Sequence, residues 1–297
     1  MSHLALAPAS SSRRIHTPAP RLLAAALAAA LLVTPLRADA QVVTTASGPT
    51  SASILAQVTA YRTSLGALNP NVATSFPSGR REINWDGVPD ARSAPNNLPA
   101  NFFNVNSPRG VVFSTPGTGF QVSANAGIAP VEFSNIDPSY STSFSTFSAQ
   151  RLFTALGSNI LDVNFFLPGS TTAALTRGFG AVFTDVDLAN STSLQFFDAA
   201  NLSLGTFFAP VGTASDGTLS FLGVLFSSPL VSRVRITSGN TALAAGATDQ
   251  NGGPRDVVAM DDFIYAETTT TPEPGTYALM GSGLLFIGML RRRRRSA

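Results

Sequence analysis

The chain lacks two residue types altogether and has almost none of a third. It contains no cysteine and no lysine, and its only histidines are His3 and His16. The absence of cysteine excludes disulfides, thiolate metal sites and cysteine nucleophiles. Both histidines precede residue 41, where we expect the mature protein to begin, so that protein has no imidazole for general acid-base chemistry or for ligating transition metals. Ser-His-Asp hydrolases, zinc enzymes with histidine ligands and Schiff-base enzymes are therefore excluded.

Basic residues are scarce between the two ends of the chain. Nine of the nineteen arginines lie in residues 1–40 and 291–295, so residues 41–290 contain ten arginines against sixteen acidic residues, a net charge of −6. An acidic body gives no electrostatic basis for binding phosphate groups. We expect no nucleic-acid partner.

Residues 1–40 have the three parts of a secretory signal peptide. Arg13, Arg14 and Arg21 precede an apolar run at residues 22–33, and Ala38-Asp39-Ala40 supplies the small residues found around a signal peptidase cleavage site. An apolar run of about a dozen residues is shorter than the roughly 20 needed to cross the hydrocarbon core of a membrane. We therefore expect export, with signal peptidase cutting after Ala40.

Residues 268–297 combine a proline motif, an apolar stretch and a basic cluster, in that order. The motif is Pro272, Glu273 and Pro274, and the apolar stretch covers residues 277–290. The prolines oppose helix formation, the apolar stretch is expected to enter the inner membrane as a short helix, and the arginines stay in the cytoplasm by the positive-inside rule. The basic cluster consists of Arg291, Arg292, Arg293, Arg294 and Arg295.

This tail resembles the PEP-CTERM sorting signal, in which Pro-Glu-Pro, a short hydrophobic helix and a C-terminal arginine cluster follow in the same order. The resemblance implies an exosortase substrate that is transiently anchored by the C-terminal helix and cut near Pro272. The protein would then be released, or attached at the surface of a bacterium that makes exopolysaccharide. A plain C-terminal membrane anchor is the alternative, although the apolar stretch is short for a permanent one.

Between the two ends, residues 50–267 predict one mainly β domain, preceded by a flexible lead-in at residues 41–49. Apolar residues recur at helical spacing over residues 51–68, which predicts one amphipathic helix. Residues 70–110 are rich in Pro, Asn and Gly and predict a long loop. The short apolar runs that follow, separated by turn residues, predict an antiparallel, jelly-roll-like β-sandwich. The expected strands are 110–115, 119–124, 131–135, 159–167, 179–187, 193–198, 203–209, 217–226, 231–238 and 256–266.

The body also looks like uncharacterised exported proteins that carry the same kind of tail. The similar stretches are residues 80–89 and residues 257–265. This resemblance supports the β-sandwich and implies no activity.

The segment around Trp85, the only tryptophan, has two interpretations. Arg80, Arg81, Glu82 and Asp86 flank the ring, and an aromatic ring beside planar polar groups is what a sugar-stacking platform needs. In the other interpretation Trp85 plugs one end of the sandwich, and Arg80 or Arg81 pairs with Glu82 or Asp86.

We expect no cofactor other than a structural calcium, for which clustered acidic side chains could supply the oxygens. If the strand ends meet, Asp185 and Asp187 would add further oxygens to such a site. The alternative is that the acidic residues are turn formers, with Asp261 or Asp262 paired to an arginine such as Arg255. The expected calcium ligands are Asp249, Asn251, Asp256, Asp261 and Asp262.

The function that these features predict is that of a non-enzymatic surface or extracellular-matrix protein with a glycan contact at Trp85. One alternative is a secreted carbohydrate-active enzyme, a glycoside hydrolase or lyase, which would need two carboxylates facing each other across a cleft. Another is a self-associating structural component of the envelope. Carboxylates that pair with arginines or stabilise turns would favour the non-enzymatic protein over the enzyme.

Overall fold

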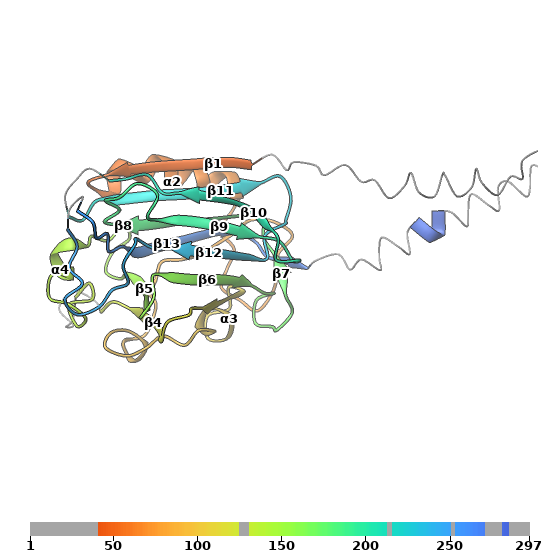
Figure 1. Cartoon of the computed structure of the whole chain (residues 1–297). Coiled ribbons are helices and arrows are strands. Elements are labelled where there is room, and N and C mark those ends of the chain that lie inside the picture. The colour runs from red at the N-terminus through yellow and green to blue at the C-terminus, as the bar shows by residue number, and fades with distance from the viewer. Residues whose placement is uncertain (1–40, 125–130, 213–215, 251–252, 271–280, 285–297) are drawn as a thin grey trace, which may run out of the picture. The chain divides into compact units, whose positions relative to one another are not determined.

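Two antiparallel sheets form the body of the protein (Figure 1). The computed structural model describes residues 41–124, 131–212, 216–250, 253–270 and 281–284. The predicted signal peptide and the sorting motif lie outside these ranges, and so does the predicted apolar helix at 277–290 except for residues 281–284, which are helical.

The larger sheet has seven strands, in the order β1, β11, β8, β13, β5 and β4, with β2 also paired to β13. Every pairing in it is antiparallel. Its strands are β1 (Gln41–Gly48), β2 (Arg80–Ile83), β4 (Gly119–Val122), β5 (Phe153–Leu156), β8 (Gly178–Thr184), β11 (Leu219–Phe226) and β13 (Ala259–Ala266).

The smaller sheet has five antiparallel strands, in the order β10, β9, β12, β6 and β3. A short two-stranded ribbon joins β7 (Ala174–Leu175) to β14 (Thr269–Thr270). The five strands are β3 (Val111–Ser114), β6 (Ile160–Phe165), β9 (Ser193–Phe197), β10 (Ser203–Phe208) and β12 (Arg233–Thr237). The predicted mainly β, antiparallel sandwich is confirmed.

The larger sheet is covered on both faces, which explains why β8 is buried at every position. Side chains alternate between the two faces of a strand. Phe179 and Phe183 therefore belong to the core between the sheets, and Val182 belongs to a second core under a helix. This burial on both sides accounts for a strand sequence that is apolar throughout instead of alternating with polar residues.

Helix α2 (Ser51–Leu65) covers the outer face of the larger sheet, where Figure 1 shows it along β1 and β11. It buries Ile54, Val58, Tyr61 and Leu65, as the helical spacing predicted. The Tyr61 ring lies so close to β11 that a Cβ atom added at Gly223 would come within 2.8 Å of its Cδ2 and Cε2 atoms. Glycine at this strand position is what lets the helix approach.

In the smaller sheet, β6 and β12 alternate between buried apolar and partly exposed polar side chains. Val163 and Val234 pair across the strands and face the core. On the opposite face Asp162 accepts hydrogen bonds from Arg233 at 2.9 Å and from Arg235 at 2.8 Å. Arg233 and Arg235 therefore share the face of β12 that lies opposite the core.

Three sequence-based expectations were wrong. Residues 41–48 are strand β1 and pair along their whole length with β11, so the expected flexible lead-in is an edge strand. The expected loop at 70–110 contains β2, the short 3-10 helix η1 (Asp90–Arg92) and helix α3 (Phe102–Val105). The expected strand at 131–135 is a turn with one isolated bridge, which precedes helix α4 (Tyr140–Ser143).

Candidate functional site

Trp85 follows β2 and is only 1 % exposed. Its ring stacks on Phe153 with centroids 4.0 Å apart, and its Nε1 donates a hydrogen bond of 2.9 Å to the backbone carbonyl of Asp261. A ring buried in this way has no face left for a sugar. The expected stacking platform is therefore wrong, and the alternative that Trp85 plugs the sandwich is right.

The arginines and glutamate beside Trp85 are engaged within the protein. Arg80 Nε donates to Glu82 Oε1 at 2.6 Å, which confirms the alternative pairing. Arg81 is fully buried and forms an ion pair of 2.8 Å with Glu267, not with Glu82 or Asp86. Asp86 is partly buried, and burial, followed by the neighbouring charge of Asp262, raises its pKa to about 6.

Strand β13 carries two adjacent buried aspartates at an irregularity in its pairing with β8 between Met260 and Phe263. Asp261 Oδ2 accepts hydrogen bonds from the backbone N–H groups of Phe147 at 2.6 Å and Ser148 at 3.2 Å. The β-bulge therefore aims this carboxylate at a loop, where it anchors the backbone. Burial is the largest cause that raises the pKa of Asp261, and the adjacent Asp262 adds to it.

Asp262 takes part in a network of ion pairs beside α2. Arg62 Nη2 lies 2.7 Å from Asp262 Oδ2 and 2.9 Å from Glu82 Oε2. One guanidinium thus bridges the two carboxylates. The sequence did foresee that Asp261 or Asp262 pairs with an arginine, but the partner is Arg62, whereas Arg255 donates to backbone carbonyls.

The same ion pairs form the floor of an open cleft of about 390 Å³ between α2, β2 and β13. A partly exposed aromatic ring, Phe147, stands in the cleft with the Arg62 guanidinium 5.8 Å from its centroid. Its lining residues are Ser51, Ala52, Leu55, Arg62, Glu82, Asn84, Phe147, Ser148 and Asp262. The cleft thus combines an aromatic face with planar polar groups, the combination that the sequence led us to expect at Trp85.

Among the described residues, the predicted calcium ligands Asp249, Asp256, Asp261 and Asp262 do not form one cluster. Asp256 accepts hydrogen bonds from the hydroxyl of Ser191 and from the backbone N–H groups of Asp187 at 3.2 Å and Leu188 at 3.4 Å. Asp261 is hydrogen-bonded to backbone N–H groups and Asp262 is paired with Arg62, as described above. Asn251 lies outside the described residues. Of the predicted set, only Asp249 belongs to the group of carboxylates that the fold brings together.

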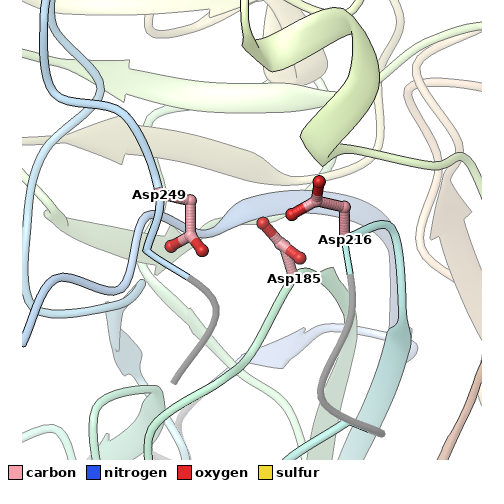
Figure 2. Close-up of side chains that lie close together, drawn as sticks. All are labelled: Asp185, Asp216 and Asp249. Carbon is pink, nitrogen blue, oxygen red and sulfur yellow. The ribbon is translucent and has the colours of Figure 1, made fainter. Parts of the chain in front are cut away.

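That group consists of Asp185, Asp216 and Asp249 (Figure 2). Asp185 follows β8, Asp216 precedes β11, and Asp249 lies between β12 and β13. One carboxylate oxygen from each lies within 4.8 Å of the other two. Burial, followed by the charges of Asp249 and Asp187, raises the pKa of Asp185 to about 9.

Sequence reasoning named Asp185 and Asp249 as oxygen donors but missed Asp216. The only signal for Asp216 was its position before Gly217 and ahead of an apolar run, which is typical of any turn. No pattern of spacing joins three residues on separate loops.

Among the described residues, no helix is long and apolar enough to cross a membrane. The predicted sorting residues Pro272, Glu273 and Pro274 and the arginines at 291–295 lie outside the described residues.

Comparison with known proteins identifies the tail. Residues 270–295 match the family described as the PEP-CTERM protein-sorting motif, as the order of motif, apolar stretch and arginines predicted. Neither the curated proteins nor the solved structures contain a match to the chain.

Proposed function

We propose that this exported protein, which its PEP-CTERM motif marks for sorting by an exosortase, is a non-enzymatic component of the cell surface or extracellular matrix. Its β-sandwich contacts extracellular polysaccharide through the cleft between α2, β2 and β13. The observation that carries this proposal is the cleft itself, where the Phe147 ring lies beside Arg62, Glu82 and Asn84.

The chemistry of the cleft suits a sugar. Phe147 is partly exposed and Asn84 is exposed, so both are accessible from solvent. An aromatic ring offers an apolar face to the C–H groups of a pyranose, and amide, carboxylate and guanidinium groups accept or donate to its hydroxyls. Because polysaccharide contacts are made by many repeated units, a shallow cleft that binds each unit weakly is sufficient for retention in a matrix.

The ion pairs of the cleft support a role without catalysis. Glu82 receives hydrogen bonds from Arg62 at 3.0 Å and from Arg80 at 2.6 Å, and Asp262 receives one from Arg62 at 2.7 Å. Glycoside hydrolysis needs two carboxyl groups that are free to face the sugar, whereas both of these groups are held by arginine side chains. Arg62 therefore orients the two groups for binding.

A secreted carbohydrate-active enzyme is the second candidate, and Asp86 is the residue that favours it. Its raised pKa of about 6 leaves a fraction of the carboxyl groups protonated near neutral pH, which is what a general acid requires. The charge of Asp262 contributes to that shift. Asp86 and a cleft carboxylate would then be the acid and its partner.

The test is a glycan array probed with the purified full-length chain and with Phe147→Ala. We expect the variant to bind about fivefold more weakly, since one ring contact contributes about 1 kcal/mol. Phe208→Ala is the matched control, because Phe208 is another exposed ring, on β10. Equal binding by Phe147→Ala and the wild type, or no binding by either, would rule out the glycan contact.

Incubation with the bound polysaccharide separates the two candidates. A non-enzymatic protein leaves the chain length of the polysaccharide unchanged. Release of shorter products that stops in Asp86→Asn would establish the enzyme instead. If the wild type binds no glycan but sediments as larger species at higher concentration, the self-associating envelope component becomes the better description.

A further inference from the structure

We infer that Asp185, Asp216 and Asp249 bind a divalent hard cation, and the chemistry of the three side chains points to calcium. Figure 2 shows the Asp185 carboxylate between the other two. All three donors are carboxylate oxygens within 4.8 Å of one another. This site is independent of the proposed glycan contact, because it shares no residue with the cleft.

Asp185 is the residue that distinguishes this group from a chance cluster of acids. Its side chain is 0 % exposed, and its Oδ1 accepts a hydrogen bond of 3.2 Å from the backbone N–H of Gly217. Its Oδ2 is buried and has no hydrogen-bond partner among the described residues. Buried carboxylate oxygens are normally paired, and here the unpaired oxygen belongs to the side chain that faces Asp216 and Asp249.

Two members of the group, Asp185 and Asp216, have no arginine partner among the described residues. Several buried or partly buried carboxylates elsewhere in the described residues pair with arginines, as in Glu82 with Arg62, Glu267 with Arg81 and Asp162 with Arg233. A bound divalent cation would take the place of that missing positive charge.

The backbone holds two of the three ligands in place. The N–H of Val257 donates to Asp249 Oδ1 at 3.0 Å, as the N–H of Gly217 does to Asp185 Oδ1. In metal sites, hydrogen bonds of this kind fix the orientation of the carboxylates that bind the metal. Because each fixes one oxygen of its carboxylate, both side chains are positioned before the cation arrives.

The donor set selects the cation. Oxygen-only sites exclude soft metals. Calcium takes about six to eight oxygens in flexible geometry, whereas magnesium demands a near-ideal octahedron. Three aspartates on separate segments, with water as the remaining ligands, suit the flexible geometry of calcium better than the octahedron that magnesium requires. Bound calcium would link the end of β8, the start of β11 and the segment before β13.

The experiment measures thermal unfolding of the purified full-length chain after removal of metal with a chelator, with CaCl₂ titrated to about 10 mM, since extracellular calcium modules bind with Kd values of about 10⁻⁴ to 10⁻³ M. We expect calcium at 10 mM, about ten to a hundred times such a Kd, to raise the wild-type Tm by roughly 3 to 10 °C. An equal response to MgCl₂ would overturn the assignment to calcium.

Two variants test the ligands. Asp216→Asn changes an exposed side chain, so it is expected to fold, and to weaken calcium binding at least about tenfold. Asp185→Asn is expected to raise the Tm of the metal-free protein, because it replaces a buried carboxyl group that is crowded by two others with a neutral amide, and to abolish the response to calcium. A purely structural role for Asp185 would not produce these opposite effects.

Asp198→Asn is the matched control. Asp198 lies in the hairpin between β9 and β10 and accepts hydrogen bonds from the N–H groups of Ala200 and Leu202, a role that asparagine can also fill. We expect its calcium response to equal that of the wild type. If calcium shifts the wild type, Asp185→Asn and Asp216→Asn by the same amount, or shifts none of them, the proposed site is refuted.

Discussion

Replacing Glu267 with glutamine is expected to destabilise the fold by about 3 to 5 kcal/mol, the cost of leaving one member of a buried ion pair without its counter-charge. Arg81 and Glu267 are 0 % and 4 % exposed. Glutamine keeps the size of the side chain and one carbonyl oxygen. The change therefore removes the negative charge and at least one of the three hydrogen bonds that the carboxylate accepts from Arg81 and Asn69, and creates almost no cavity.

The geometry explains why the guanidinium cannot escape to solvent. Its Nε and Nη2 donate to the two oxygens of Glu267 at 2.8 and 3.0 Å. Its remaining hydrogen bonds hold the loop before β2 and the turn before β3 against the end of β13. The acceptors are the backbone carbonyls of Pro70, Val72, Thr74 and Pro108.

Chemical denaturation, followed by tryptophan fluorescence, measures this change directly, because Trp85 is buried in the core. For a domain of 150 to 250 residues, each kcal/mol shifts Tm by about 2 to 4 °C, so the expected loss in a thermal scan is roughly 6 to 20 °C.

Asp162→Asn is the control, since it makes the same carboxylate-to-amide change in the partly exposed pair with Arg233 and Arg235. Exposed ion pairs contribute at most about 1 kcal/mol. If Glu267→Gln costs no more than Asp162→Asn, the buried pair does not have the role assigned to it.

Two further changes test the packing and the electrostatics. Gly223→Ala places a methyl group 2.8 Å from the Tyr61 ring and should cost about 1 to 3 kcal/mol of unfolding free energy in denaturant melts. Gly87→Ala is the control and should be neutral, because there is open space around its Cβ. Equal costs for the two variants would refute the close approach of the helix to β11. Because the pKa of Asp86 is about 6 in the folded protein and 3.8 unfolded, its stabilising contribution is complete below about pH 4 and is lost as pH rises through 6. Stability curves against pH should therefore fall less over this range in Asp86→Asn, and parallel curves would contradict the shift.

Local pattern predicted most of the secondary structure, and its failures have physical causes. Strand β1 was missed because two of its valines, Val42 and Val43, are exposed on an edge strand and give no apolar alternation. It exists because its backbone pairs with β11. Strand β5 was also missed, since a run of four residues carries little periodic signal.

The candidate sites show even more clearly that local sequence does not reveal which distant residues meet. Local sequence suggested that Arg80 or Arg81 pairs with Glu82 or Asp86, and Arg80 does pair with Glu82, two positions away on the same strand. Sequence could not show that Arg62, 200 residues from Asp262, would bridge it to Glu82. It also placed the aromatic contact at Trp85, whereas the ring accessible in the cleft is Phe147.

The amino-acid sequence by itself revealed the PEP-CTERM sorting motif and the lack of cysteine and lysine side chains for any site. A sorting signal is read from a short contiguous tail, and an absent residue type is absent from every fold. The tertiary structure alone decided which side chains meet. Whether an aspartate is a turn former, an ion-pair partner or a cation ligand depends on what lies opposite it, and those neighbours come from strands far apart in the chain. Asp185, Asp216 and Asp249 form one group only because the fold brings together the end of β8, the start of β11 and the segment before β13.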